Sequence, residues 1–156
     1  ASGFDESYFC YYEDVDLAFR LRLAGGRCFY AADARVAHIG SAVTGKNSYF
    51  SDYHIARNRL WTFFKDMPFL LLLLMGPGVA ALTCWTLIRT FGTDRFRAQA
   101  KGVADAFAGL PKVFVSRGRV QKMRTASLFA VARAFTWDFS KLRRRGEDVR
   151  PWRARV

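Results

Sequence analysis

The sequence predicts an α/β segment over residues 1–66 followed by an all-helical region over residues 67–156. Three observations predict this division. A helical pattern and two short strand-like runs alternate in the first segment, as they do in α/β proteins. A long run without charged residues then covers residues 69–88. Amphipathic stretches rich in Lys and Arg follow that run, and their spacing is helical.

The first segment begins with carboxylates set among aromatic residues. Gly3 allows unusual backbone angles, so Ser2 to Glu6 is predicted as a turn or helix start. The aromatic run from Tyr8 to Tyr12 is predicted as a short extended segment or an ordered loop. Carboxylates beside aromatic rings are costly unless something satisfies them, which makes this stretch a candidate functional site.

A helix is predicted from Glu13 to the glycine pair that begins at Gly25. Acidic residues in a first turn are favoured by the helix dipole and by the free N–H groups there. Asp16 and Arg20 are four residues apart, so they are expected to form an ion pair on one helix face. Glycine after the last apolar position is a typical helix end.

Two strands are predicted next, over Arg27–Tyr30 and Arg35–Ile39, and a mobile loop over Gly40–Gly45. A second helix is predicted over Ser51–Lys65, with Ser51 or Asp52 as its cap. Met67 and Pro68 end it. His54 is predicted to lie on the surface of this helix.

The charge of the chain is distributed unevenly. Basic and acidic residues balance up to Pro68, so the whole net charge of +12 lies in the second half. Such asymmetry indicates an anionic partner, either a nucleic acid or a membrane. The three cysteines lack metal-ligand spacing and are expected to be reduced, mostly buried thiols in a cytosolic compartment.

The uncharged run over residues 69–88 is about as long as a membrane-spanning helix. Because Pro77 lies between two glycines in it, a straight single helix is not expected. A kinked, re-entrant or interfacial hairpin is preferred to a true span, and a buried pair of core helices is the alternative. An amphipathic helix is predicted over residues 95–110, and a short apolar helix over residues 125–137, with a run of five basic residues between them. Basic amphipathic helices beside an apolar segment suit an anionic membrane surface.

The order of the motifs in residues 2–65 resembles family 2 glycosyltransferases. The motifs come in this order: Gly-Phe-Asp-Glu, an aromatic run, Glu-Asp-Val-Asp-Leu, Ala-Gly-Gly, Asp-Ala-Arg-Val, and then His. The likeness is to rhamnosyltransferase- and galactofuranosyltransferase-type members. It implies that residues 1–66 are the acceptor-side half of a GT-A fold, whose nucleotide-binding half is absent. The chain is therefore expected to be part of a longer protein and to be inactive alone.

The resemblance also implies a mechanism, the inverting transfer of a sugar from a nucleotide-diphosphate sugar. Asp14 matches the general base, and Glu13 would orient the acceptor or the base. Asp5 and Glu6 would lie near the acceptor. His38 would ligate a divalent metal, Mg²⁺ or Mn²⁺, that stabilises the leaving diphosphate. Arg57 could meet that diphosphate.

Each of these residues also has a simpler interpretation. Glu13 and Asp14 could be ordinary helix-start charges, His38 a structural histidine, and Arg57 a solvated helix residue. At the level of the whole chain, the alternatives are a basic nucleic-acid-binding module and a non-catalytic membrane scaffold. The preferred interpretation has a lipid-linked or glycan acceptor, no nucleic-acid partner, and a place at the cytoplasmic face of the bacterial inner membrane, in the synthesis of cell-envelope polysaccharide.

Overall fold

The computed structural model describes residues 3–27, 29, 34 and 48–135. The chain divides into two compact units, residues 1–126 and 127–156. The described elements are a 3₁₀ helix and six α-helices: η1 (Glu6–Tyr8), α1 (Glu13–Leu23), α2 (Tyr49–Asp66), α3 (Phe69–Thr90), α4 (Asp94–Ala108), α5 (Leu110–Lys122) and α6 (Leu128–Arg133).

The predicted α/β fold class is wrong for the part of the chain that the structure describes. Every regular element there is helical, and no strand or sheet occurs among these residues. The strands predicted over Arg27–Tyr30 and Arg35–Ile39 fall mostly outside the described residues, and Arg27 itself has no regular structure. A strand depends on a hydrogen-bonded neighbour, whereas the described helices bury their apolar faces against one another. The residues of the first segment that the structure describes therefore do not form half of a GT-A sheet.

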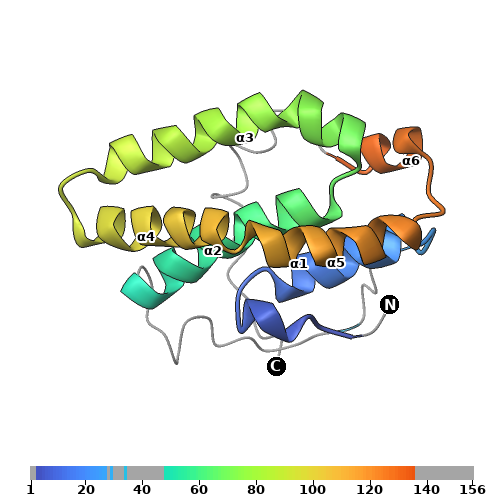
Figure 1. Ribbon diagram of the computed structural model, residues 1–156, viewed down its shortest axis with the longest axis horizontal. Coiled ribbons are helices and arrows are strands. Elements are labelled where there is room, and N and C mark those ends of the chain that lie inside the picture. The colour runs from blue at the N-terminus through green and yellow to red at the C-terminus, as the bar shows by residue number, and fades with distance from the viewer. Residues whose placement is uncertain (1–2, 28, 30–33, 35–47, 136–156) are drawn as a thin grey trace, which may run out of the picture. The chain divides into compact units, whose positions relative to one another are not determined.

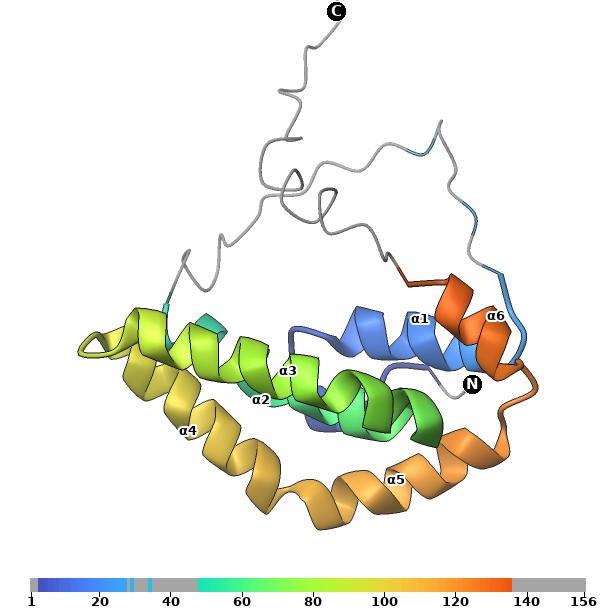
Figure 2. The same cartoon turned by 90° about the horizontal axis from the view of Figure 1, so that it is seen from above.

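Helix α2 is the centre of the first unit, and α1, α4 and α5 all pack against it. Figures 1 and 2 show α4 and α5 following each other along α2. Helix α1 packs against α2 as well. Ser48, rather than the predicted Ser51 or Asp52, caps α2, because its side chain accepts a hydrogen bond from the Ser51 N–H. The helix ends at Met67 and Pro68, as the sequence predicts.

Two glycines allow the helices to approach α2 closely. A Cβ atom on Gly102 of α4 would lie 2.5 Å from the carbonyl oxygen of Tyr53. A Cβ atom on Gly109, between α4 and α5, would lie 2.6 Å from the ring of Trp61. These contacts leave no room for a side chain, so the packing of α4 and α5 on α2 depends on both glycines.

Helix α1 begins at Glu13 and ends before Gly25, whose φ of +85° suits glycine. Its start and end agree with the prediction from sequence. The helix packs against α2 and α5. The chain after α5 is fixed to α1, because the N–H groups of Thr125 and Ala126 both donate to the carbonyl of Leu23.

Helix α3 runs without a break through Pro77, against the expectation of an interrupted run. Pro77 lacks an N–H and cannot bond the preceding turn. A Cβ atom on Gly76 or Gly78 would meet nothing within 4 Å, so the space around the proline is open. The helix can therefore absorb the proline without a clash against its neighbours. Among the described residues, α3 is long and apolar enough to cross a membrane.

The basic segment after residue 110 forms α5, which lies in the region predicted to be all-helical. Pro111 lies in its first turn, where a missing N–H costs little. In the second unit, the short helix α6 is capped by Ser127, whose hydroxyl accepts from the Ala130 N–H at 3.2 Å. The domain boundary predicted between residues 66 and 67 stays a prediction.

Candidate functional site

Glu13 and Asp14 form the first turn of α1. Asp14 is exposed, and its Oδ1 accepts a hydrogen bond from the N–H of Val15 at 2.8 Å. Glu13 is half-buried, and its Oε2 has no hydrogen-bond partner among the described residues. The helix start therefore presents one carboxylate to solvent and holds the other beneath it.

The loop before this pair is strained. Phe9, Tyr11 and Tyr12 have φ angles of 65°, 63° and 70°, in the left-handed region that non-glycine residues rarely adopt. Each such residue costs about 1–2 kcal/mol. Tyr12 is the N-cap of α1 and makes no side-chain capping bond. The direction in which α1 starts is thus set by a backbone that other residues must hold in place.

Asn58 of α2 holds that loop. Its side chain is fully buried, and Nδ2 donates to the carbonyl oxygens of Tyr8, Cys10 and Tyr11 at 3.0, 2.8 and 2.8 Å. Tyr8 is also buried, and its hydroxyl accepts from Thr62 at 3.2 Å. Asn58 was not among the residues predicted from sequence. The sequence feature that could have indicated Asn58 is its position on the side of α2 that faces the protein interior.

Arg57, predicted to meet a diphosphate, is half-buried beside Asn58. Its Nη2 donates to the carbonyl of Tyr8 at 3.1 Å, and its Cζ lies 4.4 Å from the ring centroid of Trp61. These contacts support the strained loop from a second position. The diphosphate role of Arg57 stays a prediction.

His54, predicted as a surface residue, is buried instead. Its ring centroid lies 4.4 Å from that of Phe50, 5.0 Å from that of Tyr53 and 5.8 Å from that of Phe9. Burial lowers the pKa of His54, and the nearby Arg57 charge lowers it further. The ring therefore belongs to the aromatic packing around the loop.

Asp5 and Lys65 join the N-terminal turn to the end of α2. Asp5 caps η1 by accepting from the Ser7 N–H, and its Oδ2 lies 2.7 Å from the Nζ of Lys65. Burial alone would raise the pKa of Asp5, but the hydrogen bonds from Lys65 and Ser7 outweigh it and hold the pKa at about 2. Asp5 is therefore a carboxylate throughout the physiological range.

A buried cluster of charges lies behind this pair. Asp16 forms the predicted ion pair with Arg20, Oδ2 to Nη2, at 2.8 Å, and also contacts Lys65. Asp66 is fully buried, and neither of its carboxyl oxygens has a hydrogen-bond partner among the described residues. Burial raises the pKa of Asp66 to about 8, and the neighbouring Asp16 charge contributes to the rise. Lys65 and Asp66 gave no signal in the sequence, because helix ends commonly carry such charges.

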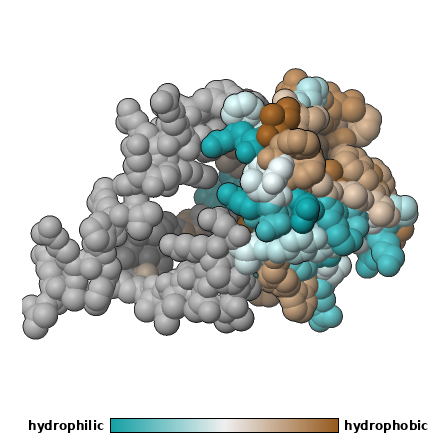
Figure 3. Space-filling model, turned by 90° about the vertical axis from the view of Figure 1, so that its left-hand side faces the viewer, coloured by the Kyte–Doolittle hydropathy of each residue, from teal (hydrophilic) through white to brown (hydrophobic). Residues whose placement is uncertain are grey.

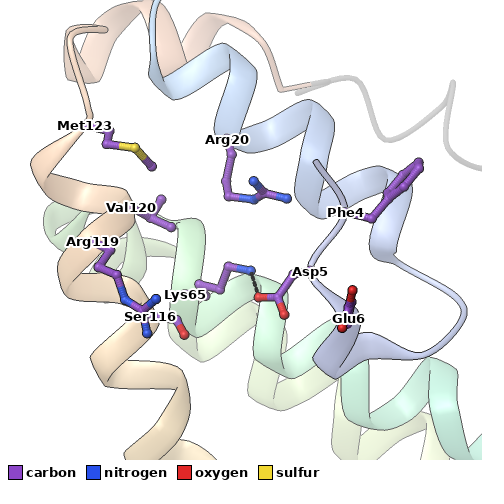
Figure 4. A pocket seen from close by; sticks show the side chains of 9 residues that line it. All are labelled: Phe4, Asp5, Glu6, Arg20, Lys65, Ser116, Arg119, Val120 and Met123. Carbon is purple, nitrogen blue, oxygen red and sulfur yellow. Dashed lines mark hydrogen bonds and ion pairs between the residues drawn. The ribbon is translucent and has the colours of Figure 1, made fainter. Parts of the chain in front are cut away.

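A pocket of about 490 Å³ lies between the N-terminal turn and α5 (Figure 4). Asp5 and Glu6 line one wall, and α5 supplies Ser116 and Arg119 on the other. The remaining lining residues are Phe4, Arg20, Lys65, Val120 and Met123. Thus the two predicted acceptor-side carboxylates share a pocket with cations from α1, α2 and α5. The structure does not place Glu13 or Asp14 among its lining residues.

The predicted metal ligand, His38, lies outside the described residues. Within those residues, no three His, Cys, Asp or Glu side chains come together in a way that could hold a metal ion. Of the cysteines, Cys10 is half-buried and Cys84 is exposed, so the expectation of burial is wrong for Cys84. Cys28 lies outside the described residues.

Comparison with known proteins gives partial matches to a rhamnosyltransferase from two strains of one species. Over 54 residues the chain is 44% identical to the N-acetylglucosaminyl-diphospho-decaprenol L-rhamnosyltransferase of Mycobacterium tuberculosis, in strains CDC 1551 and H37Rv. The match covers 33% of this chain and 18% of that protein. No protein-family model and no solved structure matches the chain. Part of the chain is thus related to a glycosyltransferase.

Proposed function

We propose that this chain is the acceptor-side part of a membrane-associated glycosyltransferase, with Asp14 as its general base. Three observations support the proposal: the partial likeness to a rhamnosyltransferase, the exposed carboxylate of Asp14 at the start of α1, and the strained loop before it. Glu13 would orient the acceptor or the base. Only the coarse relation to glycosyltransferases comes from the comparison itself.

The observation that carries the proposal is the strained loop that leads into Glu13 and Asp14. Three left-handed aromatic residues precede the pair, and the buried Asn58 bonds three carbonyls of the same loop. Strain of this kind persists where the surrounding structure fixes a functional geometry. A solvated helix start would not require a fully buried amide beneath it.

The proposed reaction is the inverting transfer of a sugar from a nucleotide-diphosphate donor to a glycan acceptor. An acceptor hydroxyl oxygen forms a bond to the anomeric carbon, while the bond from that carbon to the diphosphate oxygen breaks. The hydroxyl proton passes to the carboxylate of Asp14. The nucleoside diphosphate leaves with the electron pair of the broken bond.

The acceptor would contact the pocket that Asp5 and Glu6 line. Carboxylates accept hydrogen bonds from sugar hydroxyls, and Arg119 on the opposite wall can bind a phosphate group. The relative from Mycobacterium is named for a lipid diphosphate that carries a sugar, and an acceptor of this class would suit both walls. The reaction would take place at the cytoplasmic face of the bacterial inner membrane. A divalent cation, Mg²⁺ or Mn²⁺, remains a prediction.

The test is the substitution Asp14→Asn in the intact protein, assayed for sugar transfer with its own membranes as the acceptor source. Because the amide cannot take a proton, turnover should fall by about 10²–10⁴. The helix content, measured by circular dichroism, should not change, since Asp14 is exposed.

Asp94→Asn is the matched control. Asp94 also lies in the first turn of a helix, is 89% exposed at its side chain, and makes only a surface pair with Arg97. It should leave turnover unchanged. Turnover of Asp14→Asn equal to that of this control would remove Asp14 from the mechanism.

A further inference from the structure

Helix α3 presents its most apolar side chains to the outside. Leu70, Leu74 and Ile88 are 59%, 68% and 70% exposed, and Trp85 is 57% exposed. Residues 70, 74, 81, 85 and 88 follow helical spacing, so they form one continuous stripe, which we call the outer face. A continuous apolar stripe of this kind is unfavourable on the surface of a soluble protein, where it is exposed to water. Figure 3 shows hydrophobic atoms gathered along the top of the molecule, where α3 lies in Figure 1.

The opposite side of α3 is more polar. Thr83 is buried and accepts a hydrogen bond from the Nη2 of Arg59 on α2 at 3.0 Å. The hydroxyl of Thr90 lies 3.2 Å from the Oε1 of Gln99 on α4. The hydroxyls of Thr83 and Thr90 therefore face the protein, while the side chains of the outer face point away from it, the reverse of a surface helix in a water-soluble protein.

These contacts join the C-terminal half of α3 to α2 and α4. Helix α4 packs against α3 and carries Arg97 and Lys101, whose side chains are 79% and 59% exposed. If α3 crossed a bilayer in this arrangement, these cations and Arg59 would enter the hydrocarbon with it. Charged side chains at that depth are costly.

We propose that α3 lies in the plane of an anionic membrane surface, with its outer face in the acyl boundary and α2 and α4 on the aqueous side. The charge of the molecule matches this surface. Residues 91–126 contain eight basic residues and two acidic ones. Trp85 and Arg89, whose Cζ lies 5.9 Å from the Trp85 ring, are residue types that favour the headgroup layer. The proposal does not depend on the chemistry of Asp14.

Depth measurements at three sites of the outer face test this arrangement. Single cysteines replace Leu70, Ala81 or Ile88 in the full chain, in which Cys10, Cys28 and Cys84 are changed to Ser. Each cysteine is labelled with a fluorophore on vesicles of phosphatidylglycerol and phosphatidylcholine, and nitroxide lipids of graded depth quench it. In-plane binding predicts the same shallow depth at all three sites.

Other profiles would overturn the proposal. A spanning helix would place position 81 deepest and positions 70 and 88 near opposite surfaces. Absence of quenching at all three sites would mean that protein, not lipid, covers the outer face. Glu6→Cys is the matched control, since Glu6 is exposed at the pocket and should not be quenched.

The lipid composition tests the anionic part of the proposal separately. Vesicles of phosphatidylcholine alone should bind the chain at least about tenfold more weakly than the mixed vesicles, because several basic residues lose their attraction to the surface. Equal binding to both kinds of vesicle would contradict an anionic partner. Loss of sugar transfer in the Asp14→Asn variant should leave either result unchanged.

Discussion

Asn58 is a fully buried side chain that holds the strained loop before α1. Its buried amide donates to the carbonyls of Tyr8, Cys10 and Tyr11, and these residues surround the left-handed positions of the loop. Asn58→Ala would leave these carbonyls short of a donor. The free energy of unfolding, measured in urea, should fall by about 2–4 kcal/mol.

A matched substitution separates this effect from the general loss of an amide. Gln99→Ala removes a half-buried amide from α4, where the side chain contacts Thr90. Its cost should stay near about 1 kcal/mol or below. If both variants lose the same stability, Asn58 does not hold the loop in the way the hydrogen bonds indicate.

Asp66 should make stability depend on pH. Its pKa is raised to about 8 by burial and by the charge of Asp16, against an ordinary value of about 3.9 in the unfolded chain. Between these values the folded state holds a proton that the unfolded state has lost. Stability therefore falls as the pH rises from about 4 to about 8, and is level above that range.

Asp66→Asn keeps the side chain neutral at every pH, so it should remove this fall and be more stable than the wild type at pH 8. Urea unfolding at a series of pH values measures both curves. His54 and Asp5 titrate in both proteins, so their effects cancel in the difference. Asp94→Asn, at an exposed helix start, should follow the wild-type curve. Parallel curves for Asp66→Asn and the wild type would mean that Asp66 is ionised in the folded protein.

Only some residues of the site could be predicted from the sequence, and the reason is physical. The Asp16–Arg20 pair is separated by one helical turn, and local spacing was enough to predict it. The contacts of Lys65 with Asp16, and of Asn58 with Tyr8, join residues that are about fifty positions apart in the sequence. No local pattern records such contacts, because they depend on how α1 and α2 meet.

At the scale of the helices, Gly102 sets the distance between α2 and α4. A Cβ atom there would lie 2.5 Å from the Tyr53 carbonyl oxygen and 3.2 Å from the Arg57 nitrogen, both backbone atoms that cannot move aside easily. Gly102→Ala should therefore lower the free energy of unfolding by about 1–3 kcal/mol. Thermal or urea unfolding measures the change.

Gly118→Ala is the opposite case on a neighbouring helix. Gly118 lies inside α5, and a Cβ atom would meet nothing within 4 Å. Alanine is the better helix former, so this variant should gain about 0.5–1 kcal/mol. Equal effects of the two substitutions would show that α4 is not in tight contact with α2.

The helices themselves follow closely from sequence. The acidic first turn and the glycine pair define α1, and Met67 with Pro68 ends α2. Pro77 did not end α3, although it removes one hydrogen bond from the helix. The predicted strands were four- and five-residue runs, and such runs have no pattern that distinguishes them from other irregular segments. The α/β class depended on those runs and on the resemblance, so it was wrong where the described residues test it.

For the whole molecule, the division between a neutral first half and a basic second half left two kinds of partner open. Charge alone suits both a nucleic acid and a membrane. The structure adds an exposed apolar face on α3, formed by residues such as Leu74 and Ile88, which nucleic acid cannot cover by ion pairs. The two partners should therefore respond differently to salt.

We expect that raising NaCl from about 0.05 to about 0.5 M releases the chain from duplex DNA but leaves most of it on phosphatidylglycerol-containing vesicles. Binding to DNA rests on displaced counterions and falls steeply with salt. Binding through the outer face of α3 rests on apolar contact, which salt does not weaken. Co-sedimentation with vesicles and filter binding with DNA measure the two fractions.

Replacing Leu74 and Ile88 with Lys should make vesicle binding as salt-sensitive as DNA binding, since only the charges would then remain. Release from vesicles and DNA at the same salt concentration in the unchanged chain would contradict an apolar contribution and favour the nucleic-acid alternative.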